Sequence, residues 1–495
     1  MQRFIGGVEL KKRLFLLALL LAAALAGPAR VHAQEAGGKT YIVRYVQDTC
    51  DAQDQGAEAQ SSRPSFGAVD RSMLRILQKE GAIAWYEEDI TVYLPDAAGL
   101  GDPATSADAE SFSGSAKELS IKASDASPAT DEGESPYWQL RMIGAQETDE
   151  TAGTGIRVAV IDSGAAAHPA LARCMQTGWN YVDGTSATPD ANGHGTAVCG
   201  LIAGLAADGA MGPAPGASLI PLKCFEGTTT KVSLICEAIC DAADVYDCDI
   251  INLSVGVQQS SSSLNALKEA AAYAASKGVL IVAACGNGGT QALYYPAACE
   301  EAIGVASVDE TGLVYKSSNH NESVFIAAPG VEVVSAKRTG GTDAFTGTSF
   351  STPLVTGAIA ALMAEESALD MNAVRALLAS RAEDRGKEGL DEYYGHGILQ
   401  LAPCLEILSA KGKALLLPPV PGESALLALN RTDSPLACSL VTSSFCEGGR
   451  FLGLSAASLE IPAKSSLPAE LPEGNWRAFL CDEHFAPLAP ALSGN

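Results

Sequence analysis

The sequence predicts an α/β protein whose main domain is a mostly parallel sheet with helices on both faces. Between residues 135 and 403, nearly continuous apolar runs such as IRVAVID and GVLIVAACGN alternate with alanine-rich helical segments such as SLNALKEAAAYAASKG. Strands that are apolar along their whole length are covered on both faces, which is typical of parallel sheets. A small α+β unit precedes this domain, and a small β-sandwich-like domain follows it.

The first 33 residues have the pattern of a secretory signal peptide. Basic residues at Arg3 and at 11–13 precede the apolar run LFLLALLLAAALAG, and the small residues of VHA stand at the cleavage position. The apolar run is shorter than the about 20 residues that a bilayer span needs. We therefore expect a secreted, extracellular protein whose mature chain has no stable membrane span.

Residues 34–94 form the predicted α+β unit. KTYIVRYV (39–46) alternates like a strand, AVDRSMLRILQKEG (68–81) has helical spacing, and AIAWYEEDITVYL (82–94) indicates a further strand. Residues 95–134 then carry nine acidic and two basic residues among small and polar ones. Such a composition buries too little apolar surface to order itself, so we expect an acidic, disordered linker.

Residues 404–495 form the predicted C-terminal domain. Helical periodicity fades there, and short strand-like segments such as SALLALN and NWRAFLCD recur between prolines and glycines. This spacing is typical of a small β-sandwich.

The charge and the cysteine content argue against two classes of function, nucleic-acid binding and zinc binding. The net charge of −25 argues against a nucleic-acid partner, which needs a basic face. The chain has 13 cysteines, and Cys236, Cys240 and Cys248 lie close enough in sequence to consider a metal site. No second ligand pair follows at the spacing of a zinc finger, so buried thiols or disulfides are favoured over zinc.

The segment GTSFSTPLVTGAIA (347–360) places Ser349 at the start of a predicted helix. One interpretation is a helix cap, because serine accepts hydrogen bonds from first-turn amides. The other is a nucleophile at the positive end of the helix, where a developing oxyanion is stabilised. The choice depends on whether the chain also supplies a base and an oxyanion donor.

Three further polar residues lie at strand ends or helix starts. Asp162 ends the apolar run RVAVID, His194 lies between glycines in NGHGTAVCGLIAG, and Asn287 follows VLIVAACG. Each alone is more simply a cap, a structural histidine or a turn residue. Together with Ser349 they supply what acyl transfer to serine needs: a base, a carboxylate that orients it, and an oxyanion donor.

The sequence resembles the subtilisin-like serine proteases over roughly residues 136–400. The order Asp, His, Ser is that of subtilisin. The matching segments are VAVIDSG, NGHGTAVCGLIAG, GTSFSTPLVTGAIA, HPAL, GPAPGASLIPLKCF, IINLSVG, YYPA and APG. The resemblance implies a subtilisin-like α/β fold over 135–403 and serine endopeptidase activity on peptide or protein substrates.

The resemblance also implies catalytic roles for the four polar residues. Asp162 would orient His194, which acts as general base and then general acid, and Ser349 would be the nucleophile. Asn287 and the backbone amide of Ser349 would form the oxyanion hole. Phe350 departs from the methionine that is commoner after the nucleophile, but both side chains are bulky and apolar.

Substrate contacts follow from the same resemblance. LSVG (253–256) matches a strand that pairs with the substrate backbone, and AACG (283–286) matches a wall of the primary specificity pocket. The expected substrate-binding residues are Ser254, Val255, Gly256, Ala284, Gly286 and Tyr294. Tyr294 stands near the floor of that pocket, where its ring would favour small P1 side chains.

The α+β unit resembles the inhibitory propeptides of subtilases, with WYEED (85–89) similar to the end of their last strand. The resemblance implies that residues 34–94 inhibit the enzyme intramolecularly until they are cleaved. We expect self-cleavage near Tyr93 and Leu94 or within the acidic linker.

Catalysis of this kind needs no cofactor and no metal ligand. Structural calcium is frequent in the family, and Asp183 and Asp190 are loose candidates, but no site is assigned. We expect a monomer. Two alternatives stay open: a peptide ligase or cyclase that uses the same acyl-enzyme, and a non-catalytic binding protein with the same fold. The sequons at Asn252, Asn321 and Asn430 are nominal matches, and Asn252 lies in a predicted buried strand.

Overall fold

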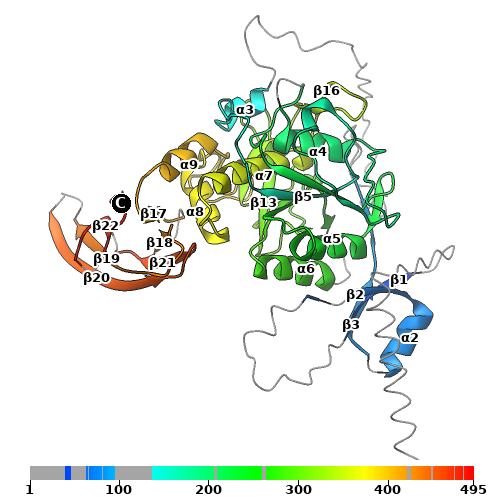
Figure 1. The fold of residues 1–495 in the computed structure, drawn as a ribbon, viewed down its shortest axis with the longest axis horizontal. Helices are drawn as coiled ribbons and strands as arrows, with labels where there is room; N and C mark the ends of the chain where they lie inside the picture. The colour runs from blue at the N-terminus through cyan, green and yellow to red at the C-terminus, as the bar shows by residue number, and fades with distance from the viewer. Residues whose placement is uncertain are drawn as a thin grey trace, which may run out of the picture. The chain divides into compact units, whose positions relative to one another are not determined.

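The computed structural model describes residues 39–45, 63–64, 66–80, 82–94, 137–205, 209–258, 264–420, 425–446, 450–472, 474–482 and 484–494. These residues fall into two compact units (Figure 1). One contains 39–45 and 66–89, and the other contains 63–64 and the chain from Ile90 onward. The predicted signal peptide and acidic linker lie outside the described residues.

The first unit is a small antiparallel sheet with one described helix. Its elements are β1 (Thr40–Tyr45), β2 (Phe66–Asp70), α2 (Arg71–Glu80) and β3 (Ile83–Glu88), in the sheet order β2-β1-β3. The predicted helix at 68–81 begins later than expected, because 66–70 pairs with β1 as a strand. Asp70 then caps α2 by accepting hydrogen bonds from the Ser72 and Met73 amides.

The second unit is built around a parallel sheet, which confirms the predicted fold class. In the described part of the chain this sheet has seven strands in the order β14-β13-β11-β9-β5-β7-β6. They are β5 (Arg157–Asp162), β6 (Trp179–Asn180), β7 (Ser218–Lys223), β9 (Ile250–Leu253), β11 (Leu280–Ala284), β13 (Ala302–Val308) and β14 (Ile326–Pro329). Every residue of β9, β11, β13 and β14 is buried, as the continuous apolar runs predict.

Helices cover both faces of the sheet (Figure 1). On one face, α4 (His194–Ala203) and α7 (Thr348–Glu365) share a core with alternate strand residues such as Val158 and Val160. On the other face lie α5 (Val232–Asp244) and α6 (Asn265–Ser276). The remaining helices of the second unit, as described, are α3 (Trp138–Met142), the short 3-10 helix η3 (Pro169–Leu171), α8 (Met371–Arg381) and α9 (Leu401–Leu408).

The parallel topology brings the polar residues at the strand ends to one edge of the sheet. Asp162 is the last residue of β5, Ser254 follows β9, and Asn287 lies just beyond β11. These three strands are neighbours in the order β11-β9-β5. His194 and Ser349 begin α4 and α7. In open parallel sheets, ligands bind at this carboxyl edge.

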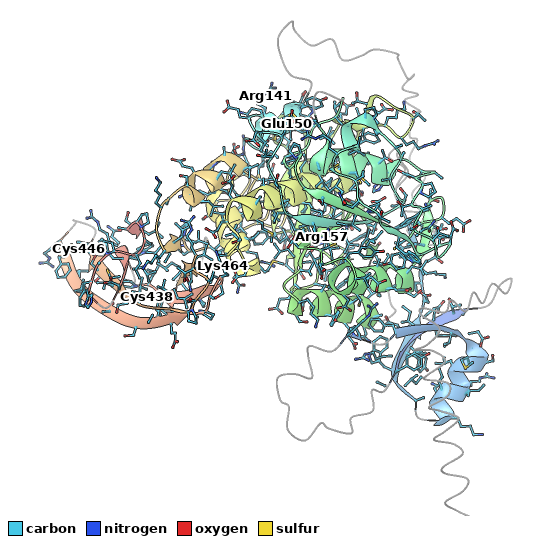
Figure 2. All side chains as sticks on the ribbon, in the orientation of Figure 1. Arg141, Glu150, Arg157, Cys438, Cys446 and Lys464 are labelled. Atoms are coloured by element: carbon cyan, nitrogen blue, oxygen red, sulfur yellow. The ribbon has the colours of Figure 1, made fainter. Side chains whose placement is uncertain are left out.

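The amino edge of the sheet is tied together by Arg157, the first residue of β5 (Figure 2). Its guanidinium Nε donates to the Tyr246 carbonyl at 2.8 Å, and its amide donates to Asp249 at 2.8 Å. Tyr246 therefore lies at the edge opposite to the strand ends that carry the polar residues.

Three short antiparallel pairs flank the main sheet among the described residues. They are β4 (Thr91–Tyr93) with β8 (Thr229–Lys231), β10 (Val257–Gln258) with β12 (Tyr294–Tyr295), and β15 (Val333–Ala336) with β16 (Thr342–Phe345). The first pair divides the segment predicted as 34–94. Residues up to Asp89 belong to the small unit, whereas β4 belongs to the second unit.

The C-terminal residues form the predicted β-sandwich. In the described chain, one antiparallel sheet has the order β17-β18-β21 and the other has the order β20-β19-β22-β23. The strands are β17 (Ala414–Leu417), β18 (Ala425–Asn430), β19 (Leu436–Phe445), β20 (Phe451–Ile461), β21 (Ser466–Glu470), β22 (Asn475–Cys481) and β23 (Leu492–Gly494). Leu426 from the first sheet shares a core with Leu440 and Trp476 from the second. Cys438, labelled in Figure 2, belongs to the same core.

A buried ion pair joins the sandwich to the main domain. The Arg431 guanidinium donates to the Glu366 carboxylate at 2.5 Å and to the Leu408 carbonyl at 2.7 Å. Only 14% of the Arg431 side chain and 8% of the Glu366 side chain are exposed. The predicted boundary at 403 falls inside α9, because Leu401 and Leu408 pack into the core of the main domain.

Candidate active site

The centre of the site is a buried aspartate–histidine pair. His194 Nδ1 lies 2.9 Å from both carboxylate oxygens of Asp162, and neither side chain is exposed. The Ser163 amide donates to Asp162 Oδ1 at 2.6 Å and fixes the carboxylate. A carboxylate held in this way fixes the imidazole tautomer that carries its proton on Nδ1, so that Nε2 can accept a proton.

Two glycines allow His194 to lie so close to the end of β5. Gly193 has φ +106°, a conformation that a residue with a Cβ rarely adopts. A Cβ on Gly195 would lie 2.1 Å from the Gly164 carbonyl oxygen. The backbone at the start of α4 therefore contacts the β5 loop directly.

Asp190 fixes the same turn from the other side. One carboxylate oxygen accepts the Gly193 amide at 2.7 Å, and the other accepts the Thr196 amide at 2.9 Å. Ser163 Oγ donates to Asp190 and accepts from the Gly195 amide, which links the loop after β5 to the helix start. From the sequence Asp190 was predicted only as a loose calcium candidate, and this positioning role was missed.

The surroundings raise the pKa of His194. Burial alone lowers it, but the Asp162 charge and hydrogen bond, with a smaller contribution from Asp190, outweigh burial and raise it above its ordinary value. The Phe350 ring lies beside the imidazole, with ring centroids 5.2 Å apart. Phe350, where the family more commonly has methionine, therefore packs against the base.

Ser349 is the second residue of α7, directly before Phe350, whose ring packs against His194. Its hydroxyl donates to the Ser254 carbonyl at 2.8 Å. His194 Nε2 is buried and has no hydrogen-bond partner among the described residues. The hydroxyl must therefore turn away from Ser254 to engage the base. Catalytic hydrogen bonds are often loose in the absence of substrate.

Asn287 is held against the start of α7. Its Oδ1 accepts hydrogen bonds from the Thr348 amide at 2.9 Å and the Thr348 hydroxyl at 3.1 Å. Because Oδ1 is engaged in this way, the side-chain nitrogen Nδ2 lies toward Gly347. A Cβ built on Gly347 would be 3.2 Å from Nδ2. A side-chain donor thus stands at the positive end of a helix, where anionic charge is stabilised.

Comparisons with known proteins agree with this arrangement. The subtilase family model matches residues 153–397. Thermitase from Thermoactinomyces vulgaris is 34% identical over 261 residues, which are 50% of this chain and 90% of that protein. Subtilisin Savinase from Lederbergia lenta is 34% identical over 249 residues, covering 50% of this chain and 89% of that protein.

The chain belongs to the subtilase family. At the level of that family it is a subtilisin-like serine protease. Among solved structures, the MycP3 protease of the type VII (ESX-3) secretion system aligns with a TM-score of 0.50 at 27% identity, over 56% of this chain and 90% of that one. A lanthipeptide protease at 24% identity, also with a TM-score of 0.50, shares the fold.

Five of the six predicted substrate-binding residues lie at or just beyond the carboxyl ends of two neighbouring strands, β9 and β11. Ser254, Val255 and Gly256 directly follow β9, whereas Ala284 ends β11 and Gly286 lies beyond it. Tyr294, on β12, is buried and contacts both glycines, since a Cβ on either would lie 2.8 Å from its ring. The structure therefore brings all six residues of the sequence prediction to the same edge.

A further edge strand was missed by the sequence analysis. β8 pairs with β4, and the Leu94 amide donates to the Thr228 carbonyl at 2.7 Å. Val92 and Leu94 are buried, whereas Tyr93 between them is exposed. The signal in the sequence was the β-branched run TTTKV beside Gly227, which is typical of a short strand.

No group of three or more His, Cys, Asp or Glu residues that could hold a metal ion occurs within the described parts of the chain. Asp183 accepts a hydrogen bond from Asn180, and Asp190 is used as described above. Cys236, Cys240 and Cys248 are buried. Burial raises the pKa of the Cys240 and Cys248 thiols to about 12.

Asn252, Asn321 and Asn430 are all buried, so these three side chains are inaccessible in the folded chain. The helices within the described ranges include none that combines the length and apolar character of a membrane span.

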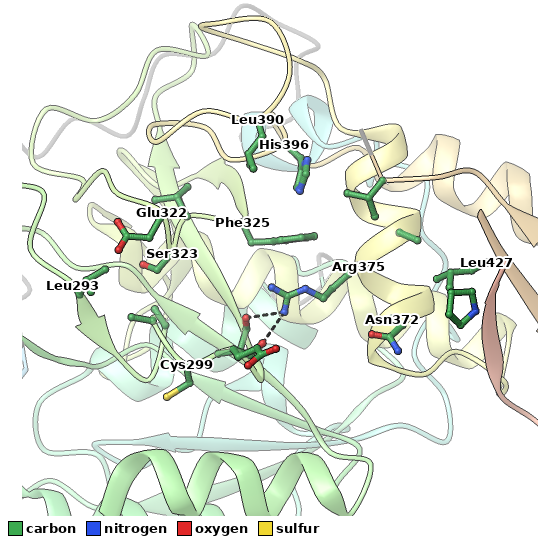
Figure 3. A pocket seen from close by; sticks show the side chains of 18 of the residues that line it. Leu293, Cys299, Glu322, Ser323, Phe325, Asn372, Arg375, Leu390, His396 and Leu427 are labelled. Atoms are coloured by element: carbon green, nitrogen blue, oxygen red, sulfur yellow. Dashed lines mark hydrogen bonds between the residues drawn. The ribbon is translucent and has the colours of Figure 1, made fainter. Parts of the chain in front are cut away.

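A separate cavity of about 650 Å³ lies between the main domain and the sandwich (Figure 3). Phe325, Arg375 and His396 line it, with the Arg375 guanidinium 4.6 Å from the centre of the Phe325 ring. Arg375 also donates to the Glu300 and Ala302 carbonyls. None of Asp162, His194, Asn287 and Ser349 lines this cavity, so we do not assign the peptidase chemistry to it.

Proposed function

We propose that the protein is a secreted serine endopeptidase, made as a self-processing proenzyme, that cleaves peptide bonds through an acyl-enzyme on Ser349. His194 Nε2 takes the hydroxyl proton while Ser349 Oγ attacks the carbonyl carbon. The carbonyl oxygen becomes the oxyanion, which receives hydrogen bonds from Asn287 Nδ2 and the Ser349 amide. His194 then gives the proton to the leaving amine, and the C–N bond breaks. Water, deprotonated by His194, hydrolyses the ester.

The buried Asp162–His194 pair carries this proposal. A histidine held at 2.9 Å by a carboxylate, with its second nitrogen buried and without a hydrogen-bond partner among the described residues, is arranged for proton transfer. A helix cap alone would explain Ser349 but not this pair. The oriented amide of Asn287 supports the same conclusion from the other side of α7.

Labelling with a fluorophosphonate probe tests the nucleophile. We expect covalent labelling of the wild type and none of Ser349→Ala. Ser351→Ala is the matched control, because Ser351 is in the same helix and its buried hydroxyl has no hydrogen-bond partner among the described residues. Loss of that hydroxyl should be nearly neutral. Labelling of Ser349→Ala, or none of the wild type, would exclude the proposed nucleophile.

Product masses distinguish hydrolysis from ligation. Peptide substrates incubated with and without an added amine should give free carboxylic acid products in both cases. If the amine adduct dominates at low amine concentration, the enzyme is a ligase or cyclase that uses the same acyl-enzyme. A folded chain that is neither labelled nor active on any peptide would indicate a non-catalytic binding protein.

The pairing of β4 with β8 supports the proenzyme. β4 is an extended segment of the chain's own N-terminal region. It pairs with the edge strand β8, which follows the carboxyl end of β7 in the sequence. Main-chain pairing with alternate buried side chains is how an extended peptide adds to a sheet edge. Residues 90–94 therefore resemble a bound peptide, as an intramolecular inhibitor requires.

The full-length Ser349→Ala variant tests self-processing. In a purified, protease-free preparation we expect the wild type to lose its N-terminal region and Ser349→Ala to keep it, as read by intact mass. The same new N-terminus in both proteins would show that another protease does the processing. Expression of the full-length chain tests the predicted secretion. We expect the protein to be recovered outside the cell with residues 1–33 cleaved off.

A further inference from the structure

We propose that Lys223 is a positioning residue for catalysis: its buried ammonium group fixes the loop after β5 that aims the Asp162 carboxylate at His194. This inference rests on the proposed peptidase function and deepens it, because it adds a side chain that none of the catalytic steps explains. Lys223 acts through the backbone of Ser163 and takes no part in the proton transfer itself.

Lys223 lies beside the catalytic aspartate. It is the last residue of β7, as Asp162 is the last residue of β5, and the two are paired in the parallel ladder between these strands. Only 7% of Lys223 is exposed, although lysine is rarely buried without a partner for its charge. Its Nζ donates a hydrogen bond to the Ser163 carbonyl at 2.6 Å. The ammonium group therefore contacts the loop that directly follows β5.

Ser163 is held at each of its hydrogen-bonding groups. Its amide donates to Asp162 Oδ1 at 2.6 Å. Its hydroxyl donates to Asp190 at 2.9 Å and accepts the Gly195 amide at 3.0 Å. Its carbonyl accepts the hydrogen bond from Lys223. The two peptide groups that flank Ser163 are thus fixed by different partners, the first by the carboxylate that it orients and the second by the ammonium group.

The second of these peptide groups joins Ser163 to a glycine. Gly164 has φ +109°, a region that glycine enters freely, so the backbone itself resists rotation little at this point. The Gly164 carbonyl oxygen lies against the start of α4, since a Cβ on Gly195 would be 2.1 Å from it. Movement of this peptide group would therefore disturb both the loop that holds the carboxylate and the helix start that carries the imidazole. The hydrogen bond from Lys223 opposes that movement.

The charge of Lys223 lies among several carboxylates. Burial lowers the pKa of Lys223, and the charges of Asp190, Asp183 and Asp162, in decreasing order, act against that effect. Asp162 and Asp190 are buried, and a buried carboxylate without a nearby positive charge is costly. Cys224 directly follows Lys223, and burial raises the pKa of its thiol well above the ordinary value, so it stays neutral. Lys223 therefore supplies positive charge to the two buried carboxylates that hold the site.

The sign of this charge effect on the base can be worked out. Asp162 and Asp190 both raise the pKa of His194. Lys223 offsets part of their negative charge, so a neutral residue in its place should raise the pKa of His194 further. Because proton transfer needs a neutral imidazole, the acid limb of kcat/KM should then move to higher pH. A residue that only stabilised the fold would lower the amount of active enzyme and leave the acid limb in place.

Three variants of the full-length chain, assayed after processing, test the inference. Lys223→Met removes the charge and the donor, and we expect kcat to fall by roughly 10- to 100-fold with little change in KM, as for a misplaced catalytic group. Its acid limb should move to higher pH. Lys223→Arg keeps a charge and a donor and should restore most of kcat and the wild-type acid limb. Lys277→Met is the control, because it removes an exposed ammonium group at the end of α6, on the other face of the sheet.

The Asp162→Asn background shows whether Lys223 acts through the aspartate. With the carboxylate already replaced, its orientation no longer matters, so Lys223→Met should lower kcat by less than about threefold beyond Asp162→Asn alone. If Lys223→Met lowered kcat by the same factor in both backgrounds, Lys223 would act independently of Asp162, and the inference would be wrong.

Other results would also overturn the inference. One is a folded Lys223→Met variant with the kcat of the wild type. Another is an acid limb that stays in place or moves to lower pH. If Lys223→Met does not fold, Lys223→Gln, which keeps a donor and loses the charge, carries the same pH measurement. Failure of the peptidase proposal is distinct, because the wild type would then neither be labelled by the fluorophosphonate probe nor cleave any peptide.

Discussion

Replacement of Asp162 by asparagine should remove almost all activity while leaving the shape of the site intact. The Ser163 amide donates to Oδ1, so the asparagine side-chain oxygen will take that position. The amino group then takes the place of Oδ2, 2.9 Å from His194 Nδ1 in the wild type. The remaining oxygen is also 2.9 Å from Nδ1 and can still accept its proton. The new donor beside it nevertheless favours the imidazole with its proton on Nε2, which can no longer accept the Ser349 proton.

The expected loss is about 10⁴-fold in kcat, the size seen when this tautomer is lost in a serine protease. That loss corresponds to about 5.4 kcal/mol in the activation barrier. The KM should change little, because Asp162 is fully buried and contacts the base and its loop.

The pH profile gives a second readout. Proton transfer needs a neutral imidazole, and the pKa of His194 is raised by Asp162 against the effect of burial. Wild-type kcat/KM should therefore fall as the pH decreases through this raised pKa. In Asp162→Asn the residual activity should persist to lower pH, because burial remains and the main contribution that raises the pKa is gone.

The assay is kcat/KM against pH with one peptide, together with the rate of fluorophosphonate labelling. Asp183→Asn is the matched control, since it removes an exposed carboxylate that does not contact the imidazole. A variant within about tenfold of the wild type would refute the tautomer argument. So would an acid limb that stays in place or moves to higher pH.

Three further predictions concern the oxyanion donor, the inhibitory segment and the domain junction. Asn287→Ala should lower kcat by about 10²- to 10³-fold with little change in KM, and an unchanged kcat would remove it from the oxyanion hole. Leu94→Asp places a charge at a buried position and should weaken the pairing of β4 with β8. The lag between folding of the proenzyme and the appearance of peptidase activity should then shorten by about tenfold or more. Tyr93→Asp, at the exposed neighbour, should leave the lag unchanged, and equal effects of the two would contradict the β4 pairing. Arg431→Met leaves Glu366 buried and unpaired, which should cost about 3–5 kcal/mol and lower Tm by roughly 6–20 °C in a catalytically inactive background. An unchanged Tm would show that the pair does not stabilise the junction.

The sequence predicted the features that depend on local pattern. The strands β5, β9 and β11 were legible because parallel strands are buried on both faces and are apolar along their length. That pattern ended at Asp162 and Asn287, and the topology rule for parallel sheets then placed these residues at one edge. The C-terminal sandwich was also predicted from spacing and turn residues alone.

Features that depend on contacts distant in sequence were not predicted. Nothing near Asp190 shows that its carboxylate will hold the turn before α4, because its partner Ser163 comes from another segment. The strand β2 was read as the start of a helix, since its pairing partner β1 lies beyond an intervening segment. The direction of the Ser349 hydroxyl depends on the Ser254 carbonyl, which the sequence alone does not place.

The order of the strands in the main sheet has a consequence for how the molecule is made. Asp162 and His194 are synthesised long before α7. The strands that lie between them and Ser349 in the sequence must pair with β5 and its neighbours before the three residues can come together. Pairings between distant segments form slowly, and parallel sheets are among the slowest. Peptidase activity should therefore appear abruptly and late in folding. By then the N-terminal segment that can inhibit the enzyme has already been synthesised.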